Sequence, residues 1–367
     1  MYIFTTMLKA LLGLLFVVTL GMNAQAQWAE FKVGRGFLIP HRTDMVHLPK
    51  SANTKLSFTV WDLKERNWKK SFHGAKIGYE AHFIDLGNKE LLGTAWSFNY
   101  KVSLPLSRRK YPLTFILGGG PAWLTNKYHV EKNPKNLAIG SHINASLFLQ
   151  IQKSFAVGPH LVSLGIDLNH YSNAATSKPN LGLNIPSFNL GFVLNGNTDK
   201  ITPTEKSVNA HHPASWAITV DGGIKELSIL DQNKYLVGNI ELRRNFKSAR
   251  NINWELGVLT GYNQSIGAYI ENDFDLESGR VKRQVKNPNI QFGPFLGGRL
   301  NFGKTSLFFH TGIYAYSKQR EIKAMFHRTG IQHMINDKIG LTILMKTHEA
   351  KAEHLGIGLT LNLASTK

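Results

Sequence analysis

Apolar and polar residues alternate with a period of two along most of the chain. Between Leu355 and Leu363, leucine and isoleucine occupy every second position, with glycine, threonine and asparagine between them. The same alternation runs through 74–86 and 337–347. Alternation over such lengths is typical of a β-strand with one apolar and one polar face, whereas helical periodicity is nearly absent. The sequence therefore predicts an all-β protein.

Turn and loop residues separate the alternating segments, for example RRKYP (Arg108–Pro112), EKNPKN (Glu131–Asn136) and NGNTDK (Asn195–Lys200). We expect about sixteen strands, give or take two or three. No sharp linker divides the chain, although the polar stretch Asn195–Ala214 is long enough to be one. The strands are predicted near 28–39, 54–63, 74–86, 93–105, 112–125, 140–155, 159–171, 184–196, 213–224, 234–246, 251–263, 288–301, 304–317, 322–335, 337–347 and 353–363.

Two architectures accommodate so many amphipathic strands, a soluble sandwich and a transmembrane barrel. Several strands carry glycine, serine, asparagine, lysine and glutamate on one face and leucine, isoleucine, valine and phenylalanine on the other. That division suits a polar lumen and a lipid-facing exterior. The pattern favours an antiparallel transmembrane β-barrel of about 12 to 16 strands.

The N-terminus predicts export. Lys9 precedes a short apolar run, Ala10–Leu20, and the A-x-A signal Ala24-Gln25-Ala26 follows it. This order is typical of a cleaved signal peptide, and the run is too short for a comfortable membrane-spanning helix. We therefore divide the chain into a signal peptide (1–26), a first set of barrel strands (27–200) and further strands of the same barrel (201–367). The expected location is the outer membrane.

Composition and charge narrow the partners. The chain lacks cysteine, which excludes disulfides and thiolate metal sites. With 43 Lys and Arg against 24 Asp and Glu, the formal net charge is +19, which favours an anionic partner. Export argues against nucleic acid and leaves lipid or cell-surface glycans. Three basic clusters are expected in loops or at the barrel rim, where they could bind lipid phosphates if they lie at the outer leaflet. They are Arg108–Lys110, Arg243–Arg244 and Arg280–Arg283.

Neither a metal site nor a phosphate loop is expected. The glycine-rich LGGGP (Leu117–Pro121) is not followed by GK[ST] and lies in a predicted strand. Several histidines lack carboxylates at a metal-ligand spacing, namely His41, His47, His327, His333, His348 and His354. The sequence therefore predicts no metal and no cofactor.

A histidine and a serine lie on the apolar face of one alternating segment. In 161–170, the apolar positions are the even-numbered ones, and His170 and Ser172 continue their parity. Asn184 shares the parity of the apolar residues in the next segment. The loop NAATSKPNLGL (Asn173–Leu183) is rich in turn residues and would bring Asn184 beside the pair. In a barrel this face meets the bilayer, so the substrate expected there is a lipid.

The residue types fit nucleophilic catalysis. Side chains at i and i+2 share a face of a strand and can reach hydrogen-bonding distance. An imidazole can accept the proton of a serine hydroxyl, and it works best when a third group holds its tautomer. Asn173 could present its amide to a developing oxyanion. The pair would equally suit hydrogen bonding to lipid headgroups, so both interpretations stay open on the residues alone.

The surrounding motif resembles the outer-membrane lipid A 3-O-deacylase (PagL-like) family. The motif is HYSNA (His170–Ala174) followed by P-N-x-G (Pro179–Gly182), and the similarity extends from roughly Gly74 to Gly196. KTHEAKAEHLGIGL (Lys346–Leu359) looks like the closing hairpin of longer acyloxyacyl hydrolase relatives. The family's smaller members are eight-stranded barrels that hydrolyse an ester-linked acyl chain of lipopolysaccharide. The additional strands here imply a larger barrel or an added domain.

By this resemblance His170 is the general base, Ser172 the nucleophile and Asn173 a contributor to the oxyanion hole. The family's third member is a glutamate, and the matching residue here is Asn184. An amide can orient a histidine but cannot offset the charge of an imidazolium ion. By parity Asp167 points into the lumen, which makes it a poor substitute for the glutamate.

Two functions follow as hypotheses. The first is an outer-membrane serine esterase that acts on lipid A, with lipopolysaccharide and the membrane as partners and a homodimer left open. The second is a non-catalytic barrel, structural or transporting, that has lost the triad acid. Glu349, beside His348, could supply an acid only if the far strands closed next to this site. If the chain starts in the periplasm, its seventh strand ends at the outer leaflet with His170 and Ser172.

Overall fold

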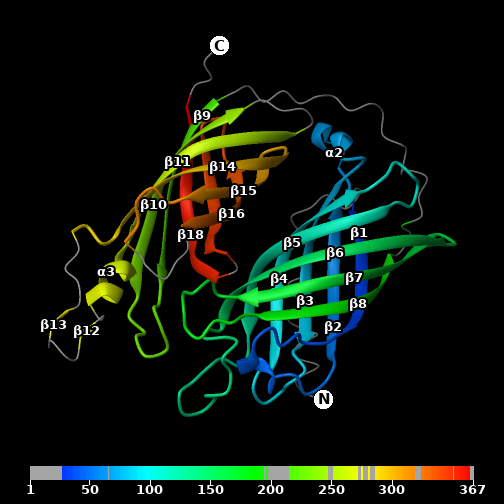
Figure 1. The fold of residues 1–367 in the computed structure, drawn as a ribbon. Coiled ribbons are helices and arrows are strands. Elements are labelled where there is room, and N and C mark those ends of the chain that lie inside the picture. Colours follow the sequence, from blue (N-terminus) through cyan, green and yellow to red (C-terminus); the bar gives the residue numbers. More distant parts are fainter. Residues whose placement is uncertain are drawn as a thin grey trace. The chain divides into compact units, whose positions relative to one another are not determined.

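The strands of the described chain form two closed antiparallel barrels and one short two-stranded sheet (Figure 1). The computed structural model describes residues 27–64, 66–193, 196, 215–246, 251–271, 274–275, 280–281, 286–318, 324–349 and 351–363. The predicted signal peptide, 1–26, lies outside these residues. Each barrel contains eight strands.

The first barrel is closed by hydrogen bonding between its first and last strands. Its strands, blue to green in Figure 1, are β1 (Gln27–Gly36), β2 (Asn53–Asp62), β3 (Lys76–Asp85), β4 (Thr94–Pro105), β5 (Leu113–Leu124), β6 (Ile143–Val157), β7 (His160–Ser172) and β8 (Leu183–Val193). Each pairs with its chain neighbour, and β8 returns to β1, with Phe192 opposite Phe31 and Ser187 opposite Gly36. Neither sheet edge is left available to later strands.

The second barrel repeats this arrangement. Its strands are β9 (Ser215–Lys225), β10 (Tyr235–Phe246), β11 (Ile252–Asn263), β14 (Ile290–Phe302), β15 (Thr305–Ile313), β16 (Met325–Met334), β17 (Ile339–His348) and β18 (Lys351–Asn362). The predicted terminal hairpin is β17 and β18, and β18 closes the barrel on β9 with Leu359 opposite Val220.

Short elements that the alternation did not predict occur between the strands. They are η2 (Thr43–Met45), α2 (Asn67–Ser71), α3 (Gln264–Glu271) and the paired strands β12 (Phe274–Asp275) and β13 (Arg280–Val281). Within the described residues, no helix has the length and apolar character needed to cross a membrane.

The all-β prediction is confirmed, because every predicted segment overlaps one barrel strand. The structure differs from the prediction in how the strands close. We expected 201–367 to extend the barrel begun by 27–200, whereas residues 215–362 close on themselves. Alternation distinguishes the two faces of a strand but does not show which strands pair with it. One large barrel and two smaller barrels therefore have the same sequence pattern.

The barrels are polar inside and apolar outside. On β7 the outward Leu164 and Ile166 are 54% and 56% exposed, whereas the inward Ser163 and Asp167 are 2% and 3% exposed. An eight-stranded barrel is just wide enough for side chains to fill its interior. Here the filling includes charged groups, such as Lys101, whose Nζ lies 2.7 Å from Glu80 Oε2. The predicted polar lumen and apolar exterior are therefore present.

A network of arginines and carboxylates fills the second barrel. Arg328 donates to both Asp221 and Glu241, and Arg243 Nη1 lies 2.5 Å from Glu241 Oε1. Arg243 also approaches Glu255, with 3.3 Å between Nε and Oε1. Arg243 is only 2% exposed. The prediction that it is a rim charge is therefore wrong, since it faces inward on β10.

Removing Arg328 should destabilise the second barrel strongly. Arg328→Ala would leave Asp221 and Glu241 buried without this guanidinium, and breaking a buried ion pair in this way costs about 3–5 kcal/mol. Thermal unfolding in detergent should show a lower midpoint. The matched control is Arg244→Ala, because Arg244 is exposed and its guanidinium lies over the rings of Trp216 and Phe246. Equal shifts for the two variants would contradict a stabilising network.

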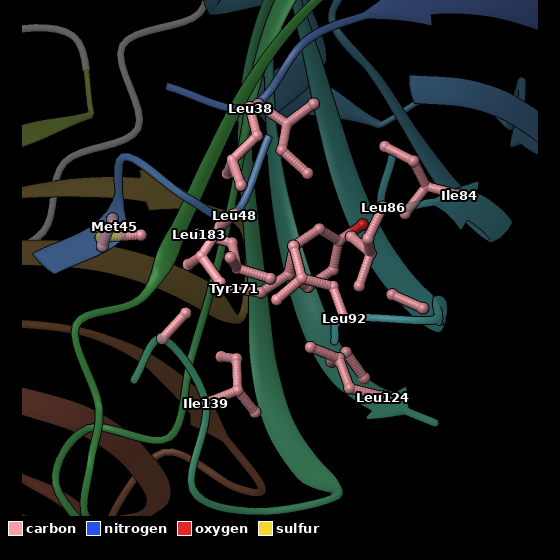
Figure 2. Close-up of a cluster of buried hydrophobic side chains, with 14 residues drawn as sticks. Leu38, Met45, Leu48, Ile84, Leu86, Leu92, Leu124, Ile139, Tyr171 and Leu183 are labelled. Atoms are coloured by element: carbon pink, nitrogen blue, oxygen red, sulfur yellow. The ribbon is translucent and has the colours of Figure 1, made fainter. Parts of the chain in front are cut away.

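One end of the first barrel contains an apolar core (Figure 2). Figure 2 shows the Tyr171 ring turned into this core with Leu183 and Leu92, and all three side chains are at most 1% exposed. The core also contains residues from the loops at this end, among them Met45 and Leu48. These contacts fix the positions of the end of β7 and the start of β8 in the first barrel.

Candidate active site

The site lies where β7 ends and β8 begins. His170 and Ser172 share the outward parity of Leu164 and Ile166, and the intervening Tyr171 points into the apolar core. Asn184 is flanked in the same way by the buried Leu183 and Ile185. Strand alternation therefore anchors the backbone on one face and presents the polar side chains on the other.

The three predicted side chains meet. His170 and Asn184 are directly opposite in the register of β7 and β8. The distance from His170 Nδ1 to Asn184 Oδ1 is 2.7 Å, and that from His170 Nε2 to Ser172 Oγ is 3.0 Å. A hydroxyl, an imidazole and an orienting group at these distances form the arrangement that nucleophilic catalysis requires.

The direction of the hydrogen bonds suits activation of the serine. An amide oxygen only accepts, so His170 Nδ1 carries the proton in its bond to Asn184 Oδ1. In a neutral ring the other nitrogen then has a lone pair. The lone pair of Nε2 can accept the hydroxyl proton of Ser172.

Asn173 holds the loop that follows the serine. Its side-chain Nδ2 donates to Ser141 Oγ at 2.9 Å, and its backbone N–H donates to Asn180 Oδ1 at 3.0 Å. Asn180 belongs to the P-N-x-G part of the motif. These bonds fix both the backbone and the side chain of Asn173, whose contribution to an oxyanion hole stays a prediction.

Gly182, the last residue of the motif, allows the loop to pass close to the histidine. Its φ is +79°, a backbone conformation that residues other than glycine rarely adopt. A Cβ atom at this position would lie 2.9 Å from His170 Cε1. The glycine is therefore required both by the backbone and by the position of the imidazole.

Gly182→Ala should lower stability and also displace His170. The left-handed conformation costs an alanine about 1–2 kcal/mol. Gly158→Ala is the matched control, because Gly158 has a φ of +57° but a Cβ atom there would meet nothing within 4 Å in the described part of the chain. Both variants should unfold at lower temperature, measured in detergent, and only Gly182→Ala should change the ¹⁵N chemical shifts of the His170 ring. Unchanged His170 shifts in Gly182→Ala would contradict the predicted displacement.

The two acidic candidates belong to different barrels. Asp167 faces the lumen and pairs with Lys55. Glu349 follows β17 in the second barrel, whereas β7 pairs only with β6 and β8 among the described strands. Among the described residues, no group of three or more His, Asp and Glu side chains is placed to hold a metal ion.

The sequence did not identify His41 as part of this site. Its Nδ1 lies 3.2 Å from Asn184 Nδ2, and its Nε2 lies 3.1 Å from the backbone oxygen of Leu181. It is separated from Asn184 by 143 positions in the chain. The P-N-x-G loop and the residues after β1 thus meet around Asn184.

An apolar groove of about 750 Å³ runs over the same outer face. Leu164 and Ile166 of β7 contribute to it, together with Phe188 and Leu190 of β8. Ile166 precedes His170 by four residues, which is about 13 Å along a strand. The residues that line the groove are Val33, Gly34, Arg35, Thr54, Leu113, Ile151, Lys153, Leu164, Gly165, Ile166, Phe188, Asn189 and Leu190.

One predicted basic cluster of the first barrel lies away from this site. Arg108–Lys110 lies in the loop between β4 and β5, at the end opposite His170, because odd and even strands run in opposite directions. Of Arg280–Arg283, Lys282 and Arg283 are outside the described residues.

Comparisons with known proteins divide the chain at the same place as the strand pairing. The family model described as lipid A 3-O-deacylase (PagL) matches residues 51–193, and that described as acyloxyacyl hydrolase, C-terminal domain, matches residues 214–365. No curated protein matches the chain. The family resemblance predicted from the sequence is thereby confirmed.

Several solved structures are similar only weakly. A mutant porin of Rh. blastica has 8% identity and a TM-score of 0.21, over 92% of this chain and 99% of that chain. Omp33 of Acinetobacter baumannii has 6% identity and a TM-score of 0.19, over 93% and 100%. The siderophore receptor PirA of the same organism has 8% identity and a TM-score of 0.24, over 89% of this chain and 68% of that chain. Scores this low carry no argument about function.

Proposed function

Because the chain belongs to the lipid A 3-O-deacylase (PagL) family, we propose that it is an outer-membrane serine esterase that removes an ester-linked acyl chain from lipid A. The observation that carries this proposal is the hydrogen-bonded series Ser172, His170, Asn184 on the outward face of the first barrel. The family supports a lipid A deacylase, and the assignment of roles to these residues is our inference.

In the proposed reaction, His170 Nε2 takes the hydroxyl proton as Ser172 Oγ attacks the ester carbonyl. The carbonyl oxygen becomes an oxyanion, to which Asn173 would donate a hydrogen bond. Collapse of the intermediate breaks the bond to the lipid A oxygen, which leaves with the proton from His170. A water molecule, deprotonated by His170, then attacks the acyl-serine. The bond from the acyl carbon to Ser172 Oγ breaks, His170 returns the proton to this oxygen, and the fatty acid is released. Asn184 holds the His170 ring throughout.

The position of the site supports a membrane lipid as substrate. The apolar groove lies on the same face of β7 as His170, so an acyl chain could lie along it while its ester reaches Ser172. β7 is the seventh strand of the described part of the chain, counted from Gln27. With the N-terminus in the periplasm, its end would lie at the outer leaflet, where the substrate would be present.

A non-catalytic barrel is the second candidate, and Asn184 is the observation that favours it. An amide provides no negative charge for the imidazolium ion that forms during the reaction. Asp167 cannot provide one on the outer face, because it is buried in the lumen with Lys55.

Incubation of the purified protein with lipopolysaccharide in detergent distinguishes the two candidates. The esterase should remove one 3-hydroxyacyl group from lipid A and release it as the free fatty acid. Mass spectrometry measures both the lighter lipid A and the fatty acid. Detergent and lipopolysaccharide without protein provide the background. Unchanged lipid A, with the barrel shown to be folded, would exclude the esterase and leave the non-catalytic barrel.

A further inference from the structure

We propose that His41 is a positioning residue that holds the Asn184 amide in the one orientation that supports catalysis. The inference rests on the proposed esterase function and extends the site beyond the residues that the sequence motif contains. It is carried by a series of contacts that begins at a backbone carbonyl and ends at the serine hydroxyl.

The backbone brings His41 to the site. After β1 ends at Gly36, the chain continues beside the start of β8, and Ile39 N–H donates to the carbonyl oxygen of Asn184 at 2.9 Å. Two residues later, the His41 ring lies between Leu181 and Asn184. The position of the ring thus follows from the same β1–β8 pairing that closes the barrel.

The carbonyl of Leu181 determines which nitrogen of His41 carries the proton. A carbonyl oxygen only accepts, so His41 Nε2 must donate in their 3.1 Å contact. A neutral ring then has its lone pair on Nδ1. That nitrogen, 3.2 Å from Asn184 Nδ2, accepts a hydrogen bond from the amide group.

This acceptor selects one of the two orientations of the amide. With the NH₂ of Asn184 directed to His41, its Oδ1 faces His170 Nδ1 at 2.7 Å. His170 then holds its proton on Nδ1 and keeps the lone pair on Nε2 toward Ser172. All donors along the series point in one direction, from the serine hydroxyl to the Leu181 carbonyl.

The reversed amide would prevent the reaction. Turning Asn184 by 180° sets its NH₂ against His170 Nδ1, which would then have to accept a hydrogen bond. The proton of His170 would move to Nε2, and Nε2 could no longer take the hydroxyl proton of Ser172. A carboxylate has no such requirement, because both of its oxygens accept. An asparagine in the third position therefore needs an orienting partner that a glutamate does not need.

Two substitutions of His41 separate hydrogen bonding from packing. His41→Phe keeps an aromatic ring but loses both hydrogen bonds, and kcat for lipid A deacylation should fall about tenfold, with KM changed less than about twofold. His41→Gln retains one donor and one acceptor and should recover most of kcat. Wild-type kcat in His41→Phe would overturn the proposal, as would an equal loss in His41→Gln.

The same substitution in an Asn184→Glu background tests the dependence on an amide. If His41 acts by orienting Asn184, His41→Phe should have less than about a twofold effect on kcat once a carboxylate is present. A tenfold loss in both backgrounds would show a merely structural role and would overturn the proposal.

A measurement without turnover keeps this inference separate from the proposed function. In Ser172→Ala protein labelled with ¹⁵N-histidine in detergent micelles, the nitrogen shifts of His170 should show the proton on Nδ1. A His170→Gln variant identifies the signal. Adding His41→Phe should shift the population toward the Nε2-protonated form. Unchanged nitrogen shifts would overturn the role of His41, whereas intact lipid A in the wild-type assay would instead overturn the esterase.

Discussion

Ser172→Ala is expected to abolish release of the 3-hydroxyacyl chain from lipid A. Turnover should fall by about 10³-fold or more, because alanine has no oxygen to form the acyl-enzyme and the remaining groups cannot replace it. The side chain is small, and its neighbours Tyr171 and Ala145 keep their places in the strands. The measurement is the initial rate of fatty-acid release from lipopolysaccharide, followed by mass spectrometry.

Ser187→Ala is the matched control for this prediction. Ser187 lies on β8 of the same barrel but faces inward, and its hydroxyl is buried without a hydrogen-bond partner among the described residues. Removing that oxygen should leave both the fold and the rate nearly unchanged. Activity in Ser172→Ala equal to that of wild type would contradict the role of Ser172 as the nucleophile.

Asn184→Leu is expected to lower kcat by about 10²-fold or more, since His170 loses the group that holds its proton on Nδ1. Leucine has the same branched shape at Cγ without a hydrogen-bonding group, and the neighbouring Leu183 and Ile185 retain their contacts in the apolar core. Thermal unfolding checks that the barrel is intact, and the rate of fatty-acid release measures the effect. A rate within about twofold of wild type would show that His170 needs no partner at this position.

Asn184→Glu should act in the opposite direction. A carboxylate both orients His170 and offsets the positive charge that the ring acquires during proton transfer. We therefore expect a higher kcat than that of wild type, measured in the same assay. A lower kcat would indicate that the surroundings of the site, including His41, are adapted to an amide.

Much of the site was predictable because strand alternation is a local property. Once β7 is recognised, the apolar Leu164 and Ile166 predict that His170 and Ser172 lie on the same, outward face of the strand. The same parity places Asp167 inside the barrel, where it pairs with Lys55. The presence of Gly182 in the motif is also explained locally, because the loop requires a left-handed φ at this residue.

Other features depend on contacts between distant segments. Arg243 looks like part of a basic cluster in the sequence but is buried between Glu241 and Glu255. His41 shows no pattern that connects it to Asn184, because its partner lies on a strand that is 143 positions away. Neither role follows from the residues near it in the chain.

The sequence by itself determined the strands and the face on which each side chain lies, because a period of two is written into consecutive residues. Only the tertiary structure decided that β8 returns to β1 and that β18 returns to β9, since alternation is the same whichever strand is the neighbour. That closure also brings His41 to Asn184. The number of barrels and the contact between His41 and Asn184 are therefore both consequences of strand pairing.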